Sequence, residues 1–240
     1  MKSIPMMVQQ IGSWEVLINR RPRTPQELTS RYDALSESWG RITRRLQLET
    51  AYRKPLKASG ISAMLDHHGP DAWVLDCGIG NGSLSIALNS ILPRSAQFHG
   101  IDMSAKMLVS AGALLQEAGI QPHLKQANVL SLPYDDQSFD VVMAAHILEH
   151  LSDPQLALSE MFRVLKPGGM IFVCMTRPSF FGALIQLRWR TWAISEDQGI
   201  TWLLNCNLTE IDLQPVHLGS CAGHASTAFW ARRHGQESIL

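Results

Sequence analysis

The sequence predicts an α/β protein with a doubly wound, mainly parallel sheet, and two observations support that fold class. From residue 73 onward, short apolar runs alternate with segments of helical spacing, an order typical of parallel strands with helices on both faces. The first apolar run ends in Asp76 and breaks into glycines at alternate positions, Gly78, Gly80 and Gly82, before helical spacing begins. This strand–turn–helix unit leaves backbone N–H groups free at the carboxyl end of a strand.

Composition limits the classes of protein to consider. The chain has 240 residues, enough for one domain with appendages and a sizeable core. Lys plus Arg and Asp plus Glu both number 21. Such a balance argues against nucleic acid as a partner, because proteins that bind phosphate backbones carry a basic excess. No apolar run reaches the length of a membrane span, so we expect no stable membrane insertion. The cysteines lack C-x-x-C spacing, which indicates reduced thiols in a cytoplasmic protein; they are Cys77, Cys174, Cys206 and Cys221.

The N-terminal part, residues 1–70, is predicted to be mainly helical. Residues 1–19 show no pattern that assigns a structure. Thr24 and Pro25 have the form of an N-cap followed by proline at the first helical position. Helical spacing then continues to Leu65, with a break expected near Gly40.

The remaining chain is predicted to form a seven-stranded sheet. Strands are expected near residues 73–77, 97–101, 123–128, 139–144, 170–175, 211–216 and 227–232. Helices near 83–92, 104–118 and 153–165 separate most of the first five, and Ser104 and Asp153 are candidate N-caps. The last two strands are too close in sequence for a helical crossover, so they should pair antiparallel.

Polar residues stand at the predicted ends of the first three strands, where open α/β sheets bind ligands. Asp76 ends the first, and Asp102, 26 positions later (102 − 76), ends the second. An acid in the second position accepts hydrogen bonds from both hydroxyls of a ribose. Asn128 ends the third, and its amide can accept from an adenine amino group and donate to a ring nitrogen. These residues fit an adenosine ligand.

The glycine spacing discriminates between cofactors that contain adenosine. Dinucleotide-binding folds use G-x-G-x-x-G, and Ser83 occupies the third glycine position here. The Gly-Lys-Ser/Thr of a nucleotide-binding P-loop is absent. The residues therefore fit an adenosine without a pyrophosphate, as in S-adenosylmethionine (SAM). A NAD(P)-linked oxidoreductase remains the less favoured alternative.

Four motifs in order resemble the class I SAM-dependent methyltransferases, in particular the small-molecule branch that includes the ubiquinone/menaquinone methyltransferases. They lie at residues 74–82, 100–107, 132–142 and 163–169. The resemblance implies a Rossmann-like fold with an antiparallel final strand. It also implies biosynthetic methyl transfer from SAM to a small organic acceptor, apolar or aromatic, with S-adenosylhomocysteine as the other product. Asn128 departs from the family, which often has Asp there, but Asn keeps an acceptor oxygen.

The resemblance also implies which residues hold the cofactor. Residues 31–39 resemble a helix that folds over the cofactor in this branch, which would bring Tyr32 to the methionine end; a packing role for this ring fits equally well. The chain then divides into an N-terminal segment and helical cap, residues 1–70, and a SAM-binding domain, residues 71–240. The expected cofactor-binding residues are Tyr32, Asp76, Gly78, Gly80, Asp102, Met103, Asn128, Val129 and His146.

Candidate catalytic residues follow the fourth predicted strand. Methyl transfer from a sulfonium is an in-line displacement in which alignment supplies much of the rate, and a base is needed only if the acceptor must lose a proton. His146, Glu149 and His150 are spaced i, i+3 and i+4, so they share one face of a helical turn. We expect His146 and His150 to be catalytic, with a structural histidine as the alternative at 146. The related segment of ubiquinone O-methyltransferases holds a divalent metal, and a histidine here would favour Zn²⁺ or Fe²⁺; we expect no metal.

An aromatic insert around residues 178–204 precedes the last two strands. We expect it to cover an apolar or aromatic acceptor, with an arginine for an acidic group. The sequence of the insert is equally compatible with an amphipathic helix that packs on the sheet or touches a membrane surface. The chain as a whole is also compatible with a homodimer. A SAM-fold protein that binds without catalysis is a further alternative. The insert and its flank contain Phe180, Phe181, Leu184, Ile185, Trp189, Trp192 and Trp202, interleaved with Arg177, Arg188 and Arg190.

Overall fold

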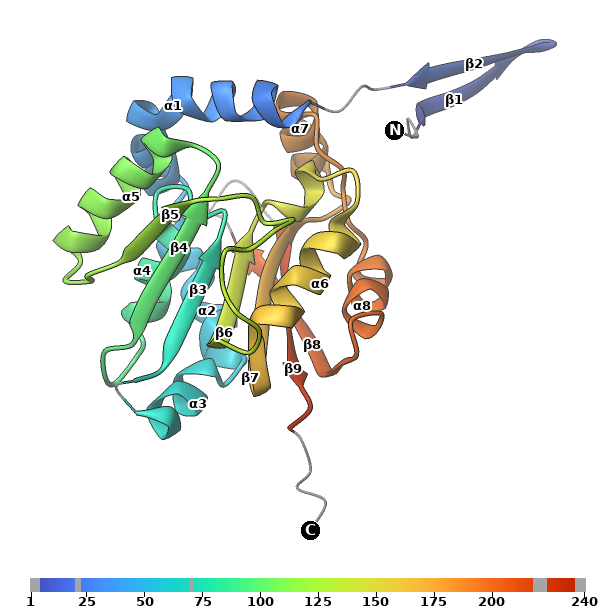
Figure 1. The fold of residues 1–240 in the computed structure, drawn as a ribbon. Helices are drawn as coiled ribbons and strands as arrows, with labels where there is room; N and C mark the ends of the chain where they lie inside the picture. Colours follow the sequence, from blue (N-terminus) through green and yellow to red (C-terminus); the bar gives the residue numbers. More distant parts are fainter. Residues whose placement is uncertain (1–4, 20–22, 70, 218–223, 236–240) are drawn as a thin grey trace.

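The computed structural model of the chain describes residues 5–19, 23–69, 71–217 and 224–235. Its centre is a seven-stranded sheet with the order β5-β4-β3-β6-β7-β9-β8 (Figure 1). The first five strands pair in parallel, and β9 pairs antiparallel with both of its neighbours. The predicted sheet with an antiparallel final strand is confirmed. The strands are β3 (Trp73–Cys77), β4 (Gln97–Asp102), β5 (His123–Gln126), β6 (Phe139–Ala145), β7 (Leu165–Thr176), β8 (Leu208–His217) and β9 (His224–Arg233).

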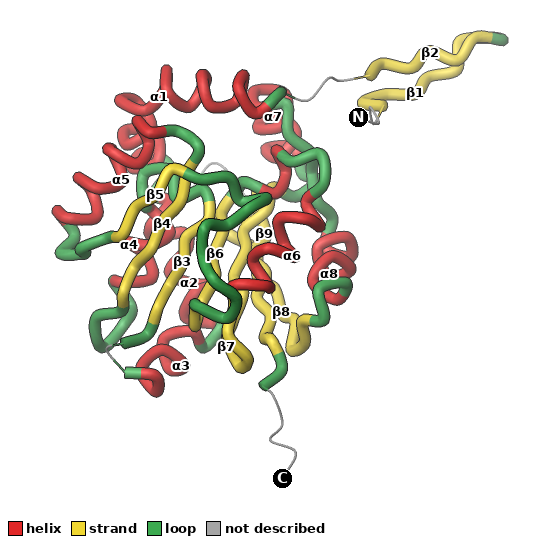
Figure 2. Tube along the Cα trace, viewed as in Figure 1, coloured by secondary structure: helices red, strands yellow, loops and turns green. Residues whose placement is uncertain are grey.

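Helices cover both faces of this sheet (Figure 2). Successive strand residues alternate between two buried clusters, with Val74 in one and Leu75 in the other. The first cluster includes residues of α2, α3, α4 and α5, and the second includes residues of α6 and α8. The helices are α1 (Pro25–Arg45), α2 (Leu48–Ala58), α3 (Ile61–His68), α4 (Ser83–Asn89), α5 (Ala105–Glu117), α6 (Pro154–Val164), α7 (Phe180–Trp189) and α8 (Glu196–Leu204).

The predicted helix starts are confirmed by side-chain caps. Ser104 accepts from the backbone N–H of Met107, and Asp153 caps α6 in the same way. At α1, the Thr24 hydroxyl accepts from Glu27 N at 3.2 Å, and the Glu27 carboxylate accepts from Thr24 N at 2.8 Å. This reciprocal pair is a capping box, which fixes where the cap helix begins.

The break predicted near Gly40 is wrong, because α1 continues through it to Arg45. The helix axis changes at Gln47 instead, where φ is 53°. Helix α1 packs on α5 at Gly40, and an added Cβ there would lie 4.0 Å from Leu114. The glycine therefore accompanies close helix packing and does not end the helix.

Residues that the sequence pattern left unassigned form a hairpin of β1 (Pro5–Ile11) and β2 (Trp14–Asn19). Ile11 pairs with Trp14, so the loop consists of Gly12 and Ser13, and Gly12 has a φ of 62°. A two-residue loop with glycine first is a hairpin signal that could have been used. In Figure 1 the hairpin extends away from the rest of the molecule.

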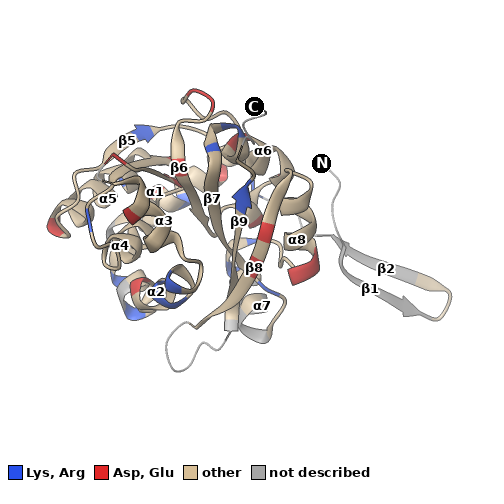
Figure 3. Ribbon diagram, turned by 90° about the horizontal axis from the view of Figure 1, so that it is seen from below, with Lys and Arg blue, Asp and Glu red and all other residues tan. Residues whose placement is uncertain are grey.

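Among the described residues, the helices do not combine the length and the apolar character needed to cross a membrane. Figure 3 shows acidic and basic residues interspersed over the described elements. Cys77, Cys174 and Cys206 are buried free thiols, and Cys221 lies outside the described residues. The aromatic insert forms α7 and α8; the side chains of Phe180, Phe181 and Leu184 lie outside the described part.

Candidate active site

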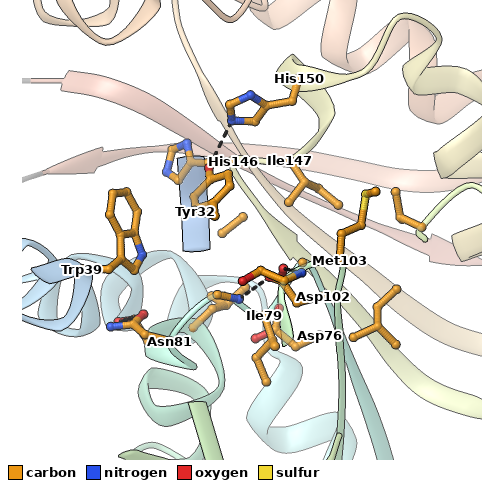
Figure 4. A pocket seen from close by; sticks show the side chains of 18 of the residues that line it. Tyr32, Trp39, Asp76, Ile79, Asn81, Asp102, Met103, His146, Ile147 and His150 are labelled. Carbon is orange, nitrogen blue, oxygen red and sulfur yellow. Dashed lines mark hydrogen bonds between the residues drawn. The ribbon is translucent and has the colours of Figure 1, made fainter. Parts of the chain in front are cut away.

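A pocket lies at the carboxyl ends of β3, β4 and β6, beneath α1. In Figure 4, Asp76, Asp102 and Met103 lie at one end of it, and Tyr32, His146 and His150 lie at the other. We call these ends the acidic end and the histidine end. All of the candidate residues predicted from the sequence line this pocket: Tyr32, Asp76, Gly78, Gly80, Asp102, Met103, Asn128, Val129, His146 and His150.

The glycine turn between β3 and α4 forms the floor of the acidic end. Gly78 has a φ of 68°, and an added Cβ would lie 2.3 Å from Cγ2 of Ile147. Any other residue type would require the Ile147 side chain to shift and would be strained by the positive φ. The Gly80 N–H donates to the Asp102 carboxylate at 3.0 Å, which holds the turn against the end of β4.

Asp102 is oriented by backbone donors on both of its oxygens. Oδ2 accepts from Gly80 N, and Oδ1 accepts from Ser104 N at 2.8 Å. Burial raises the pKa of Asp102, and these hydrogen bonds oppose that rise. Each carboxylate oxygen keeps a further lone pair for a ligand hydroxyl. The arrangement fits a ribose with two adjacent hydroxyls.

Asp76 lies almost fully buried below the same end of the pocket. Its Oδ2 accepts from the Ser85 hydroxyl at 2.7 Å. Burial raises the pKa of Asp76 to about 7, and the charge of Asp102 adds to the rise. A buried carboxylate with a raised pKa gains from a cationic ligand group, because the cation favours the ionised form.

Asn128 differs in detail from the prediction. Strand β5 ends at Gln126, so Asn128 lies two residues beyond it. Its side-chain oxygen accepts from the backbone N–H of Leu130 at 3.0 Å. This local turn uses one lone pair of the oxygen and fixes the side chain, so the second lone pair and the amide NH₂ are left for a ligand.

An aromatic roof joins α1 and α7 above the histidine end. Tyr32 stacks on Trp189 with the ring centroids 5.1 Å apart, and Trp39 meets the two rings edge-on at 5.8 and 5.4 Å. The guanidinium of Arg23 donates to the carbonyl of Trp189. Of the insert's tryptophans, Trp189 thus belongs to the roof, whereas Trp192 packs in the cluster that α6 and α8 share.

Tyr32 and His150 form a polar contact within this roof, with the hydroxyl 3.3 Å from Nε2. Burial raises the pKa of Tyr32 and lowers the pKa of His150 to about 4. At neutral pH the phenol is therefore protonated and the imidazole is neutral. The hydroxyl and Nε2 therefore share one hydrogen bond between two neutral groups, and the histidine tautomer determines which of them donates.

Two further side-chain contacts tie α1 to the sheet. The Asn81 amide donates to the Thr43 hydroxyl at 2.7 Å, and the Ser104 hydroxyl donates to the Asp33 carboxylate. They connect α1 to the glycine turn and to the end of β4. Sequence reasoning did not anticipate Asn81 and Thr43, nor Tyr52 of α2, which also lines the pocket. The spacing of polar residues along the sequence does not predict contacts between residues that are so far apart in the chain.

His146 has an unusual backbone conformation, with a φ of 58°. Its N–H donates to the carbonyl of Cys174 at 2.9 Å, and its Nδ1 lies 3.1 Å from Glu149 Oε1. The turn that follows is the 3₁₀ turn η1 (Leu148–His150). The predicted shared face is only partly present, since the two histidines line the pocket and Glu149 is buried against β7.

Glu149 and Thr176 complete the polar group behind His146. Glu149 Oε1 also accepts from Thr176 N at 3.1 Å and from its hydroxyl at 2.7 Å. Burial raises the pKa of Glu149, but the hydrogen bond and charge of His146 outweigh burial, so that the pKa is lowered. Within the described part of the chain, the His, Cys, Asp and Glu side chains form no group of three suited to a metal ion.

A family model described as a methyltransferase domain matches residues 75–173, the part that runs from β3 into β7. Its match spans the glycine turn, Asp102 and His146, and relatives and solved structures of the same family accompany it. The chain belongs to the SAM-dependent methyltransferase family. The family predicted from the four sequence motifs is thereby confirmed.

Two curated members of the family illustrate the relationship. A ubiquinone/menaquinone biosynthesis C-methyltransferase of Bdellovibrio bacteriovorus is 39% identical over 100 residues, 42% of each chain. A demethylmenaquinone methyltransferase of Lactiplantibacillus plantarum is 31% identical over 163 residues, 66% of each chain. The chain spans about half the length of the curated relatives it matches.

Solved structures share this methyltransferase fold at low sequence identity. A SAM-dependent methyltransferase of Thermotoga maritima has a TM-score of 0.65 and 17% identity, and the match covers 86% of this chain and 99% of that one. The [4+2]-cyclase SpnF has a TM-score of 0.66 and 17% identity, covering 89% and 97%. The same fold therefore occurs in proteins named for different reactions.

Proposed function

We propose that the protein transfers a methyl group from SAM to a small organic acceptor. The observation that carries the proposal is the acidic end of the pocket. The Asp102 carboxylate is fixed there by two backbone N–H groups beside a glycine turn that a Cβ would disrupt. This geometry suits a ribose and a closely approaching chain.

The residues of the acidic end receive roles that match their contacts. Asp102 accepts from the ribose hydroxyls, and Met103 and Val129 supply apolar contacts to the adenine, with the Asn128 NH₂ as a donor to it. The backbone at Gly78 and Gly80 borders the methionine portion. The buried carboxylate of Asp76 provides the counter-charge for the ammonium group. SAM supplies an electrophilic methyl group on a sulfonium when it is bound.

The histidine end is the proposed acceptor site. Its walls include Leu28 and Trp39 from α1 and Tyr52 from α2, and the polar groups among them are the two histidines and Tyr32. An apolar pocket with few polar groups suits an aromatic ring that carries a hydroxyl. Relatives named demethylmenaquinone methyltransferases support a naphthoquinol as the first acceptor to test.

The contacts of α1 support different roles for the N-terminal part and the rest of the chain. Residues 1–70 act as the cap, because Tyr32, Trp39 and Thr43 of α1 line the pocket from above. Residues 71–240 form the methyltransferase domain. Helix α7 in the insert covers the acceptor through the stacking of Trp189 on Tyr32.

Calorimetric titration with SAM and with NADH tests the cofactor. We expect binding of SAM and S-adenosylhomocysteine and none of NADH; the opposite result would favour the oxidoreductase. Transfer of a labelled methyl group from SAM to reduced demethylmenaquinone then tests the acceptor class. Binding of SAM without methyl transfer to this quinol would support SAM as the cofactor and exclude this quinol as the acceptor.

A further inference from the structure

Glu149 is buried beside the pocket without lining it, and it contacts His146, which does line it. We propose that Glu149 is a positioning residue: it holds His146 in the tautomer that carries its proton on Nδ1, leaving Nε2 bare as the base for the methyl acceptor. The inference rests on the proposed function, because it requires that the pocket hold SAM and an acceptor.

The contacts of one oxygen determine the tautomer. Glu149 Oε1 accepts from the backbone N–H and the hydroxyl of Thr176, at 3.1 and 2.7 Å. A backbone N–H can only donate, so Oε1 is fixed as an acceptor. His146 Nδ1, 3.1 Å from the same oxygen, must then carry a hydrogen. In a neutral imidazole this leaves Nε2 without one.

The other oxygen of Glu149 argues against a purely structural role. Oε2 is buried and has no hydrogen-bond partner among the described residues. The side chain is 1% exposed, so this oxygen is shielded from bulk water. Buried polar atoms without a protein partner are rare, and catalytic groups are among those that have this property.

The backbone of His146 fixes the ring from its other side. A φ of 58° is left-handed, a conformation that is unfavourable for a residue other than glycine and persists only where surrounding contacts fix it. The hydrogen bond from His146 N to the Cys174 carbonyl holds that conformation against β7. The imidazole is thus held by its backbone and by Glu149, with the Nε2 edge left for the pocket.

His150 cannot serve as the base in the same way. Its Nε2 is engaged in the hydrogen bond with the Tyr32 hydroxyl, so this nitrogen either carries a proton already or has its lone pair occupied. Of the two histidines predicted to be catalytic, the contacts therefore assign the base to His146. His150 and Tyr32 join the cap to the site.

The proposed step transfers one proton to His146 and one methyl group to the acceptor. A proton leaves the acceptor for Nε2 of His146, and the electron pair left on the acceptor forms a bond to the methyl carbon. The methyl–sulfur bond breaks, and its electrons return to the sulfur. The sulfonium becomes a neutral thioether, and the positive charge passes to an imidazolium beside the Glu149 carboxylate. The acceptor class is then a phenol, a hydroquinone or an enol, whose reacting system has an acidic proton.

Nitrogen NMR of the whole protein tests this directly. With ¹⁵N-labelled histidine, long-range proton–nitrogen correlations distinguish the two tautomers, and the spectrum of His146→Gln assigns the signal. We expect the Nδ1–H form for His146 in the unaltered protein. In Glu149→Leu we expect the Nδ1–H preference to be lost. In Glu149→Gln we expect it to persist, because the Thr176 N–H orients the amide oxygen toward the position of Oε1.

Binding and kinetics separate this role from folding and from the proposed function. SAM affinity should stay within about twofold in both variants, whereas methyl transfer to reduced demethylmenaquinone falls about 100-fold or more in Glu149→Leu. Glu149→Gln should recover most of the loss. An Nε2–H tautomer in the unaltered protein, or an unchanged tautomer in Glu149→Leu, would overturn the proposal. Absence of SAM binding would instead refute the proposed function, while the tautomer measurement still decides the role of Glu149.

Discussion

The two ends of the pocket are built in different ways. The acidic end consists mainly of backbone and side chains at the ends of β3 and β4, within residues 76–104, and Asn128 and Val129 after β5 complete it. The histidine end takes side chains from α1, α2 and the turn after β6, and two of them, Tyr32 and His150, are 118 positions apart. The first therefore depends on local turn geometry, and the second depends on how separate segments pack. We expect substitutions at the two ends to affect different measurements.

The largest expected effect is that of Gly78→Ala at the acidic end. The new Cβ would meet Ile147 at 2.3 Å in a left-handed conformation. Such backbone costs about 1–2 kcal/mol before the clash is counted. We expect SAM affinity, measured by calorimetry, to fall about 100-fold or more, equivalent to about 2.7 kcal/mol.

Gly40→Ala is the matched control, since its Cβ would meet only Leu114, at 4.0 Å, within a continuous helix. We expect it to raise the free energy of unfolding by about 0.5–1 kcal/mol and to leave SAM affinity unchanged. Destabilisation by this substitution would contradict the unbroken α1.

Asp102→Ala ranks second. It removes charge-assisted hydrogen bonds to the ribose, worth about 1.5–3 kcal/mol, so SAM should bind about 10- to 150-fold more weakly. Calorimetry measures this directly. Unaltered affinity would mean that the ribose does not lie at Asp102.

The pH dependence of SAM binding ranks third. The Asp76 carboxyl, with a pKa of about 7, must be ionised to pair with the ammonium group. Relative to Asp76→Asn, affinity should therefore rise about tenfold from pH 6 to pH 8. A parallel pH dependence in both proteins would rule out the pairing.

These titrations should stay above pH 6, because His99 makes the fold sensitive to acid. Burial lowers the pKa of His99 to about 4, and both ring nitrogens lack partners among the described residues. Its unfolded pKa is near 6.5. Since the folded pKa is the lower one, its stabilising contribution is present above pH 6.5 and is lost as pH falls toward 4.

The smallest expected effect lies at the histidine end. Trp189→Ala removes the ring stacked on Tyr32, and an aromatic pair contributes about 0.5–1.5 kcal/mol. We expect the KM for the acceptor to rise about 2- to 10-fold while SAM affinity is unchanged. Trp192→Ala, which alters the cluster of α6 and α8, should lower thermal stability without changing that KM. Equal effects on KM would remove the distinction between the two tryptophans.

The same contrast explains what could be predicted from the sequence. The strand–helix alternation and the spacing from Asp76 to Asp102 depend on short-range patterns, so the sheet and the acidic end were predicted. The hairpin was not predicted, because residues 1–19 show no pattern that assigns strands and the two-residue loop Gly12–Ser13 is a short local signal. The position of Asn81 opposite Thr43, and of Trp189 against Tyr32, depends on packing between distant segments. Sequence spacing does not encode such contacts.

Four polar contacts hold α1 and the residue Arg23 that precedes it. Three come from α1 and reach the glycine turn, the end of β4 and the turn after β6, and the fourth joins Arg23 to α7. Each contributes about 0.5–1.5 kcal/mol, and the helix lifts off only when all four break together. A cap helix held by several contacts determines how long a bound molecule stays in the pocket. If the pocket holds SAM as proposed, we expect opening of α1 to slow the release of the spent cofactor, which a burst in the first turnover would reveal.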